Sequence, residues 1–394
     1  MNYPPSDAAV EQAFEKWLSS GEPTGTLTRS IEVERSWDET PRTVTLSARY
    51  EFAHPEGKPR LTAILDGVEV SLDEPLRLKP VYIPKPWGRE IWHSGIEARG
   101  ESHIVGNNGA SLPLSHYLAL APQRLCRGEP VVLLKVLDPR PEPVLGELYL
   151  EVHENKREVY VVTHVDTNAW PGGEGRIRFG ANQAKRREYG DDNAFRSAYL
   201  RAVQKYRQIR TAIDSGEQVD EERERQARVA MEQFTELKPL KVGDVVTVPT
   251  WLPHSLQHGV RVVEFQTPVF ERHIISFPQK VLTQEHWDSE IAIKRMTLEA
   301  PAEPDFVELC PGVERIASFD DFNVCRLTLT PNARFNLPQQ VPYALCIALG
   351  GGIRVGALSL APGEACFVPH SALQSPVGNV SGQTEICLVA ARDL

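Results

Sequence analysis

Short apolar segments bounded by Gly or Pro recur along this chain and limit the folds open to it. They lie at 131–137, 147–153, 158–163, 244–249 and 261–266. Each is long enough for one strand and shorter than a typical helix, and helices do not alternate regularly with them. The 31 prolines make up roughly 8% of the chain, where ~5% is usual, which fits frequent turns. The pattern predicts a β sandwich or barrel rather than a parallel sheet of βαβ units.

The first 80 residues form a separate β-rich pattern. A short helix is predicted over 8–19, followed by strands at 43–50 and 61–70, where apolar and polar residues alternate. Asp66-Gly67, between two apolar runs, predicts a tight hairpin turn. The opening Met1-Asn2-Tyr3-Pro4-Pro5 has neither a basic nor an apolar segment, so no secretory signal is expected.

One segment, 192–237, breaks the β pattern. Apolar residues recur there at helical spacing, at Phe195, Tyr199, Ala202, Val203, Tyr206, Ile209 and Ile213. Asp192 or Asn193 is placed to cap the start and Gly216 to end this helix, and a charged second helix is predicted from about Asp220 to Leu237. We interpret the hairpin as a solvated packing element, with a lid over a site as the alternative.

Charge and cysteine content exclude several classes of protein. The chain carries 43 Lys and Arg against 53 Asp and Glu, a formal charge of -10, which disfavours general nucleic-acid binding. It has no long apolar run, so no membrane span is expected. The six cysteines form no C-x-x-C pair and lie mostly in strand-like runs. Buried reduced thiols, and hence a cytoplasmic location, are the expectation.

Two segments carry side chains of the types that bind metals in proteins. The first runs from Gly146 to Glu158. Residues two apart on a strand share a face, so Glu151 and His153 are expected to point the same way. Glu158 follows a four-residue gap, which is long enough for a tight turn onto a neighbouring strand. Three ligand-type side chains should therefore converge from two adjacent strands.

The second segment runs from Gly243 to His258. An apolar strand there ends in a Pro-bounded turn that delivers His254. Two histidines and two carboxylates suit a divalent first-row metal and leave positions open for water or substrate. Each of these residues alone is more often an ordinary strand residue, but their joint spacing favours a metal site.

The spacing resembles the two-part cupin motif, G-x5-H-x-H-x3–4-E followed by G-x5-P-x-G-x2-H-x3-N. Its second half is matched at Gly243, Pro249 and His254, with Trp251 for the motif Gly and His258 for the Asn. In the first half, Glu151 stands for the first His.

The flanking segments resemble type I phosphomannose isomerases of the cupin superfamily. Segments 131–138 and 150–153 are similar to their L-V-K-L-L-D-A and L-S-V-Q-V-H-P-D, 156–161 to G-K-x-E-x-W-Y, and 262–268 to L-L-E-I-Q-Q-P. Pro86-Trp87-Gly88 lies where their W-G-G occurs, and the helical insertion falls where they carry a helical domain. The resemblance covers roughly residues 81–285, with a faded second cupin to the end.

This resemblance implies an aldose–ketose isomerase that acts on mannose 6-phosphate, fructose 6-phosphate or a related sugar phosphate. The family holds zinc with Gln, His, Glu and His, which correspond by position to Glu151, His153, Glu158 and His254. It implies catalytic roles for Arg272, Glu264 and Lys156, and substrate contacts by Lys280, Tyr149 and Lys135. The expected cofactor is one divalent metal, Zn2+ first, with Fe2+ or Mn2+ as alternatives.

Several departures from the family pattern concern this site directly. Glu151 replaces the ligand Gln and adds a negative charge, which weakens the Lewis acidity of a bound ion and favours harder ions. Bulky Tyr149 replaces a family Ser, and the loop after the ligand His is reduced to Glu154-Asn155. The first 80 residues have no counterpart in the short bacterial enzymes. These departures predict a reshaped pocket.

The expected architecture is mainly β, a bicupin of two jelly-roll barrels with an inserted helical hairpin and an extra N-terminal β-rich element. The predicted domains are 1–80, a metal-binding cupin at 81–290 with its insertion at about 185–240, and a degenerate cupin at 300–394. Gln374 stands where the last domain would carry a ligand His, so that barrel is expected to serve packing or dimer contact. The protein is expected to be a monomer or homodimer.

Two other functions fit the same residues. One is a cupin of different chemistry, such as an Fe(II) dioxygenase or an epimerase, which the change to Glu151 and the bulky Tyr149 motivate. The other is a non-catalytic sugar-binding protein that keeps the metal as a structural element. The resident metal separates the isomerase from the dioxygenase, and the effect of replacing Arg272 separates the isomerase from the binding protein.

Overall fold

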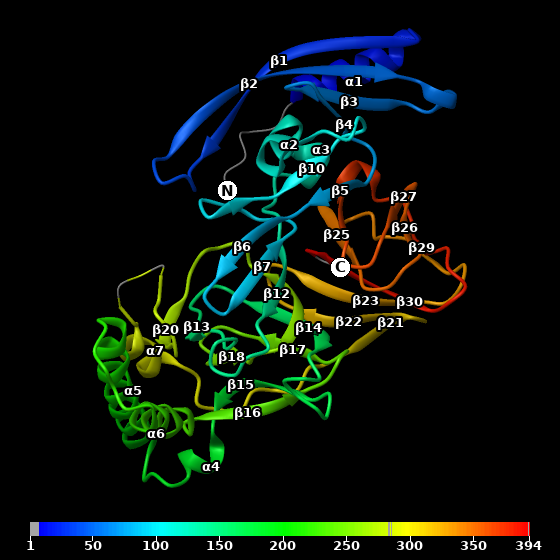
Figure 1. Ribbon diagram of the computed structural model, residues 1–394. Helices are drawn as coiled ribbons and strands as arrows, with labels where there is room; N and C mark the ends of the chain where they lie inside the picture. Colours follow the sequence, from blue (N-terminus) through cyan, green and yellow to red (C-terminus); the bar gives the residue numbers. More distant parts are fainter. Residues whose placement is uncertain (1–7, 283, 285, 393) are drawn as a thin grey trace. The chain divides into compact units, whose positions relative to one another are not determined.

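The computed structural model describes residues 8–282, 284, 286–392 and 394 (Figure 1). Residues 1–7, on which the expectation of no secretory signal rests, lie outside these ranges. The chain is mainly β and divides into two compact units, neither of which is one continuous stretch. The first comprises 1–83, 92–135 and 305–394, and the second comprises 84–91 and 136–304. The three-domain division expected from the sequence stays a prediction.

The first unit opens with a helix on a sheet, as the alternating pattern predicts. Helix α1 packs Phe14 and Trp17 against Phe52 of the sheet, with ring centroids 5.6–5.7 Å apart. Asp66 and Gly67 both have positive φ, 49° and 76°, the turn geometry that matches the twist of a two-residue hairpin. The elements are α1 (Ala8–Ser20), β1 (Thr24–Arg35), β2 (Arg42–Ala53), β3 (Arg60–Leu65) and β4 (Val68–Ser71), with the 3-10 turn η1 (Pro55–Gly57).

The rest of the first unit is a nine-stranded sheet with smaller elements around it. The sheet order is β11 (Ser111–Pro113), β10 (His103–Val105), β5 (Leu76–Lys79), β28 (Ala365–Pro369), β25 (Tyr343–Ala348), β30 (Glu385–Ala391), β23 (Asn323–Leu329), β22 (Val313–Ser318) and β21 (Val307–Cys310). A four-stranded sheet has the order β24 (Arg334–Phe335), β29 (Val377–Asn379), β26 (Ile353–Val355) and β27 (Leu358–Leu360). The remaining elements are β8 (Ile96–Glu97), β9 (Gly100–Glu101), α2 (Leu114–Leu120), α3 (Pro122–Cys126) and η2 (His370–Ala372).

The C-terminal part of this unit encloses its own core, in which Cys346, Cys366 and Cys387 are fully buried. All six cysteines are unpaired thiols, as expected, but Cys310 is exposed at the edge of the sheet rather than buried. The segment 353–360 is the hairpin β26–β27. Gly356 has φ 57° there and turns the chain back.

Two sheets enclose the core of the second unit. One has the order β17 (Val245–Val248), β14 (Glu158–Val165), β19 (Val260–Gln266), β12 (Leu133–Pro139), β7 (Gly88–Trp92) and β6 (Val81–Lys85). The other has the order β16 (Thr235–Leu240), β15 (Gly175–Ala181), β18 (His254–Leu256), β13 (Leu150–Val152) and β20 (His273–Ser276). The apolar residues of both inner faces form one cluster, so this unit has the layered form that the short strands predict.

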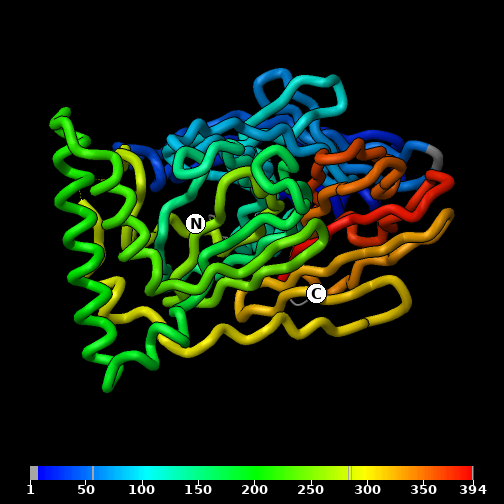
Figure 2. The backbone as a smooth tube through the Cα atoms, turned by 60° about the horizontal axis from the view of Figure 1, so that its bottom comes forward, coloured from blue at the N-terminus to red at the C-terminus, as the bar shows by residue number. Residues whose placement is uncertain are grey.

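The helices of the second unit are α4 (Gln183–Arg186), α5 (Asp192–Asp214), α6 (Glu221–Glu232) and α7 (Ser289–Arg295). Figures 1 and 2 show α5 and α6 side by side. The apolar face of α5, including Phe195 and Tyr206, is buried in the core of the unit, so the helical hairpin packs as an integral part of it. No helix in the described part of the chain combines the length and apolar composition that crossing a bilayer requires.

Two predicted helix boundaries are wrong. The cap of α5 is Asp191, whose carboxylate accepts from the backbone N–H of Ala194, rather than Asp192 or Asn193. Helix α6 ends at Glu232 instead of Leu237, because the chain enters β16 at Thr235. The hydroxyl of Thr235 donates to the Glu232 carbonyl and satisfies one of the last acceptors of the helix.

Candidate metal centre

Four side chains of the second unit converge between its two sheets. Glu151, His153 and His254 each offer a ligand atom, and these atoms lie within 4.8 Å of one another. The carboxylate of Glu158 contacts both histidines: one oxygen lies 3.3 Å from Nε2 of His153 and the other 3.3 Å from Nε2 of His254. The spacing of the sequence thus brings all four residues to one place.

The strand pairing explains this convergence. Glu151 on β13 lies directly opposite His254 on β18. His153 follows the end of β13, and the chain turns through 154–157 before Glu158 begins β14. His153, Glu158 and His254 are almost wholly buried, whereas the Glu151 side chain keeps 16% of its surface exposed. Solvent or a ligand therefore approaches this cluster from the side of Glu151.

Hydrogen bonds orient the ligand groups. Nδ1 of His254 donates to the backbone carbonyl of Leu252 over 2.9 Å, which leaves Nε2 as the basic nitrogen that faces Glu158. The ammonium of Lys156 lies 2.6 Å from one oxygen of Glu158, and the hydroxyl of Tyr160 donates to the other over 2.5 Å. Glu158 is thus held at both oxygens by residues that flank it in sequence.

Burial and neighbouring charges set the protonation of the cluster. Burial, helped by the charge of Lys156, lowers the pKa of His153 to about 4. Burial would also lower the pKa of His254, but the hydrogen bond and charge of Glu158 outweigh it and raise that pKa. For Glu158 and Glu151 burial alone raises the pKa, yet the cationic neighbours hold both pKa values below the usual range. The cluster therefore combines ionised carboxylates with a neutral His153.

The residues present fit a divalent metal. Apart from the Glu158 oxygens 3.3 Å away, the buried Nε2 of His153 and Nε2 of His254 have no hydrogen-bond partner among the described residues. An imidazole lone pair that faces an ionised carboxylate is costly to bury unless a proton or another cation lies between the two. Two neutral imidazole nitrogens and two carboxylates are a ligand set that suits Zn2+, Fe2+ or Mn2+. A divalent metal accounts for this arrangement.

A second carboxylate fixes the short loop between His153 and Glu158. The Glu271 carboxylate accepts backbone hydrogen bonds from Glu154, from Asn155 at 2.6 Å and from Lys156 at 3.3 Å. Burial alone would raise its pKa, but the backbone N–H groups of Glu154 and Asn155 hold the pKa of Glu271 below its usual value. Three backbone N–H groups that donate to one carboxylate hold this turn rigidly. The turn places the Lys156 ammonium against the Glu158 carboxylate.

Arg272 and Tyr149 form one wall of the cluster. The Arg272 guanidinium lies 4.3 Å above the centre of the Tyr149 ring, and one of its nitrogens lies 4.0 Å from a Glu151 oxygen. The Tyr149 ring also packs against Phe277, with ring centroids 4.1 Å apart. Bulky Tyr149 thus provides an aromatic support for the Arg272 cation beside Glu151, the most exposed ligand group.

Trp251, at the position of the motif Gly, adopts the left-handed conformation that favours Gly, with φ 61°. Its ring stacks on His273 with centroids 5.4 Å apart, and the Arg295 guanidinium lies 4.1 Å from its centre. Its backbone N–H donates to the His153 carbonyl over 2.7 Å. Stacking on both side chains accounts for a bulky residue in a conformation that costs about 1–3 kcal/mol.

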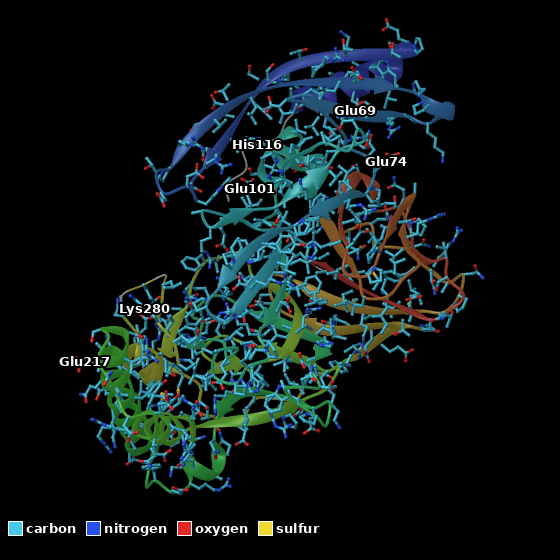
Figure 3. The ribbon with its side chains drawn as sticks, viewed as in Figure 1. Glu69, Glu74, Glu101, His116, Glu217 and Lys280 are labelled. Atoms are coloured by element: carbon cyan, nitrogen blue, oxygen red, sulfur yellow. The ribbon has the colours of Figure 1, made fainter. Side chains whose placement is uncertain are left out.

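Of the other residues predicted for the site, Glu264 lies next to the cluster. It is buried on β19 directly opposite Tyr160 of β14, whose hydroxyl donates to Glu158. Lys135 is buried on β12. Lys280 is exposed in the segment that follows β20, and it forms no ion pair with the described residues (Figure 3). The structure thus gathers Arg272, Lys156 and Tyr149 around the four ligand groups and gives Lys280 no such contact.

Sequence reasoning missed three contributors to this site. Tyr160 lies two residues after Glu158 on the same strand face, and that period of two was a usable signal. Glu271 acts through backbone N–H groups far away in sequence, which no local pattern reveals. The third is Glu90, whose carboxylate lies 3.2 Å from the Lys85 ammonium in a buried ion pair. The charge of Glu90 contributes to the raised pKa of Tyr149, although burial is the larger cause.

Comparison with known proteins shows the fold. No family model matches the sequence, and no curated protein matches it. The mannose 6-phosphate isomerase of Bacillus subtilis is similar in structure, with a TM-score of 0.59 at 15% identity, over 80% of this chain and 99% of that one. A variant of the phosphomannose isomerase of Salmonella typhimurium gives a TM-score of 0.62 at 15% identity, over 81% of this chain and all (100%) of that one.

A zinc-bound mannose 6-phosphate isomerase is also similar, with a TM-score of 0.61 at 14% identity, over 82% of this chain and 100% of that one. The structural similarity agrees with the motif resemblance. This chain has the mainly β, cupin-type fold of the phosphomannose isomerases.

Proposed function

We propose that this protein is a metal-dependent aldose–ketose isomerase that acts on a phosphorylated sugar, mannose 6-phosphate with fructose 6-phosphate or a close relative. The observation that carries the proposal is the convergence of Glu151, His153, Glu158 and His254, with Lys156 and Arg272 beside them. The structural similarity to a zinc-bound mannose 6-phosphate isomerase supports it.

The reaction moves a proton between C1 and C2 of the sugar through an enediolate. It needs a base near the carbon and positive charge near the two oxygens. A divalent metal, when bound, supplies a Lewis acid for those oxygens. We assign Zn2+ first, with Fe2+ and Mn2+ as alternatives, and Glu151, His153, Glu158 and His254 as the ligands.

The chain's own residues supply the remaining roles. Arg272, held over Tyr149 and close to Glu151, is placed to stabilise negative charge that develops at the exposed side of the cluster. Glu264 or Lys156 is the proposed base. Lys156 lies 2.6 Å from Glu158 as an ammonium partner, so Glu264 is the better candidate for proton abstraction. Lys280 and Lys135 are the further proposed substrate contacts, with Tyr149 lining the pocket.

One observation favours a second function. Glu151 places a second carboxylate beside two histidines, and added carboxylate oxygen ligands favour harder ions such as Fe2+. An Fe(II)-dependent oxygenase therefore remains the alternative. Bound iron with oxygen consumption would favour it, whereas turnover with a redox-inert metal would favour the isomerase.

A coupled assay tests the proposal. Protein loaded with Zn2+, Fe2+ or Mn2+ is mixed with mannose 6-phosphate, and the fructose 6-phosphate formed is measured. We expect turnover that a chelator abolishes and that His254→Ala lacks because it loses the metal. Stoichiometric metal without turnover on mannose 6-phosphate or related aldose phosphates would overturn the isomerase assignment while keeping the metal centre.

A further inference from the structure

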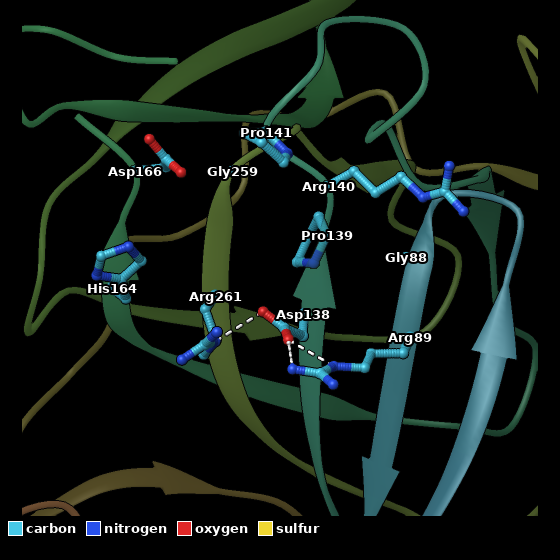
Figure 4. A pocket seen from close by; sticks show the side chains of 10 residues that line it. All are labelled: Gly88, Arg89, Asp138, Pro139, Arg140, Pro141, His164, Asp166, Gly259 and Arg261. Carbon is cyan, nitrogen blue, oxygen red and sulfur yellow. Dashed lines mark hydrogen bonds and ion pairs between the residues drawn. The ribbon is translucent and has the colours of Figure 1, made fainter. Parts of the chain in front are cut away.

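A cavity lined by ten residues lies in the same unit as the metal centre, at the other end of its six-stranded sheet. Figure 4 shows the residues that line it. It has a volume of about 430 Å3 and opens to solvent. Its walls come from the start of β7, the end of β12, the end of β14 and the start of β19. Glu158 begins β14 and His164 lies six residues further, so the two sites are roughly 20 Å apart along the strand.

Three arginines line this cavity. Arg89, Arg140 and Arg261 lie there with His164 and with the carboxylates of Asp138 and Asp166. One oxygen of Asp166 accepts hydrogen bonds from the backbone N–H groups of Asn168 at 2.8 Å and Ala169 at 3.4 Å. This concentration of positive charge occurs on a chain whose formal charge is -10.

Two of the arginines are held in place by one carboxylate. Nε of Arg89 donates to one oxygen of Asp138 over 2.7 Å, and Nε of Arg261 donates to the other over 2.7 Å (Figure 4). Burial alone would raise the pKa of Asp138, but the hydrogen bonds and charges of Arg261 and Arg89 lower it. Asp138 is therefore ionised and fixes a pair of guanidinium groups side by side, each with further N–H donors.

Arg140 and His164 complete the lining without partners of their own. Neither side chain makes a hydrogen bond or an ion pair with any other residue in the described ranges. The backbone beneath Arg140 is nevertheless rigid, because its N–H donates to the Trp87 carbonyl and its carbonyl accepts from Gly259. A Cβ at position 88 would collide with the carbonyl oxygen of Asp138, so this part of the cavity wall requires Gly88.

We propose that this cavity is a second ligand site, separate from the metal centre, that binds a phosphate-bearing small molecule. The guanidinium fork matches phosphate oxygens in pairs, and a pair of arginines fixed by a shared carboxylate loses little freedom when it binds. The volume suits a sugar phosphate or a comparable metabolite. The proposal does not depend on the isomerase assignment, because none of its residues belongs to the metal centre.

Isothermal titration of the full-length, metal-loaded protein tests this site. Inorganic phosphate, pyrophosphate and mannose 6-phosphate are titrated into the wild type, Arg140→Gln and Arg261→Gln. Exposed Arg207→Gln on α5 serves as a control for the loss of one positive charge. We expect Arg140→Gln and Arg261→Gln each to weaken pyrophosphate binding about tenfold, while Arg207→Gln changes it less than twofold. The Arg140 side chain makes no hydrogen bond or ion pair with described residues, so its variant should fold normally.

The His254→Ala variant separates the two sites. We expect it to bind pyrophosphate like the wild type, because the cavity lies away from the metal ligands. Binding of mannose 6-phosphate that is weakened by Arg140→Gln would identify a phosphate ester as the ligand class, and binding of the inorganic anions alone would identify the free anion. The proposal is overturned if the wild type binds none of the three probes. It is equally overturned if the arginine variants bind normally while His254→Ala abolishes binding.

Discussion

The Glu271 carboxylate lies 2.6 Å from the backbone nitrogen of Asn155, although 116 residues separate them in the chain. With the N–H groups of Glu154 and Lys156 also directed at it, this one side chain fixes the turn that links two proposed metal ligands, His153 and Glu158. The shortened loop is thus stabilised by a residue on the segment that carries Arg272. Both walls of the candidate site depend on this contact.

Replacement of Glu271 should loosen that turn. Hydrogen bonds to a charged acceptor contribute about 1.5–3 kcal/mol each, so Glu271→Ala should speed amide hydrogen exchange at 154–156 at least tenfold. Glu271→Gln keeps an acceptor oxygen without the charge and should give an intermediate rate. Hydrogen exchange read by mass spectrometry measures this directly, with exposed Glu290→Ala as the control. Unchanged protection at 154–156 in Glu271→Ala would refute the role assigned to Glu271.

The charge of Glu151 should strengthen metal binding. Glu151→Gln keeps an oxygen ligand but removes one negative charge beside two histidines and Glu158. We expect the affinity for Zn2+ to fall about tenfold, equivalent to ~1.4 kcal/mol. Competition with a chromophoric chelator measures the change. Glu154→Gln, on the neighbouring loop, should leave the affinity within twofold, and equal affinities of wild type and Glu151→Gln would show that the charge of Glu151 does not strengthen metal binding.

Arg272 should matter for catalysis and not for metal content. Its guanidinium faces the exposed side of the ligand cluster, so Arg272→Ala should lower kcat by two to three orders of magnitude, the usual range of about 10²–10³ for losing one charge-stabilising group. Metal content, measured by elemental analysis, should stay near the wild-type value. Tyr149→Phe keeps the aromatic support and should retain most of the activity. Full turnover in Arg272→Ala would remove Arg272 from the proposed mechanism.

Acid should destabilise the first unit through His93. This residue is 3% exposed, and burial lowers its pKa to about 4 from an ordinary value of 6.5. The unfolded chain therefore binds a proton that the folded chain rejects between these values, and stability is lost as the pH falls from 6.5 towards 4. The loss approaches about 3 kcal/mol at the lower end.

Urea unfolding at pH 7.5 and pH 5 measures this effect. The fall in the unfolding midpoint between the two pH values should be smaller in His93→Gln and His93→Phe than in the wild type. A fall of the same size in all three proteins would show that other groups cause the acid sensitivity. Because the chain has two compact units, the transition assigned to the first unit must be followed separately.

The sequence predicted those features that depend on local spacing. The period of two placed Glu151 and His153 together, and the four-residue gap allowed Glu158 to return on β14, where it now contacts both histidines. Asp66-Gly67 formed the expected turn, and α5 buried the expected apolar face. Such features are determined by residues that are close in the chain, so a pattern can reveal them.

Features that depend on distant packing could not be predicted in this way. The stack of Trp251 with His273 and Arg295, which accommodates a Trp at a glycine position, joins three separate segments. The arginine-lined cavity draws on β7, β12, β14 and β19, and Asp138 of β12 holds Arg89 of β7 and Arg261 of β19 through one carboxylate. The predicted end of α6 is wrong because the polar sequence pattern does not change at Glu232. The helix ends there because the following residues form β16, which pairs with β15.

The central claim is metal-dependent proton transfer on a sugar phosphate, and the most direct test is proton NMR in deuterated water. Metal-loaded wild type is incubated with mannose 6-phosphate, and the C1 and C2 proton signals are followed beside His254→Ala. We predict conversion to fructose 6-phosphate with deuterium entering at the reacting carbon, and neither process in His254→Ala. A wild-type protein that holds its metal yet gives neither conversion nor exchange, with mannose 6-phosphate or related aldose phosphates, would contradict the claim.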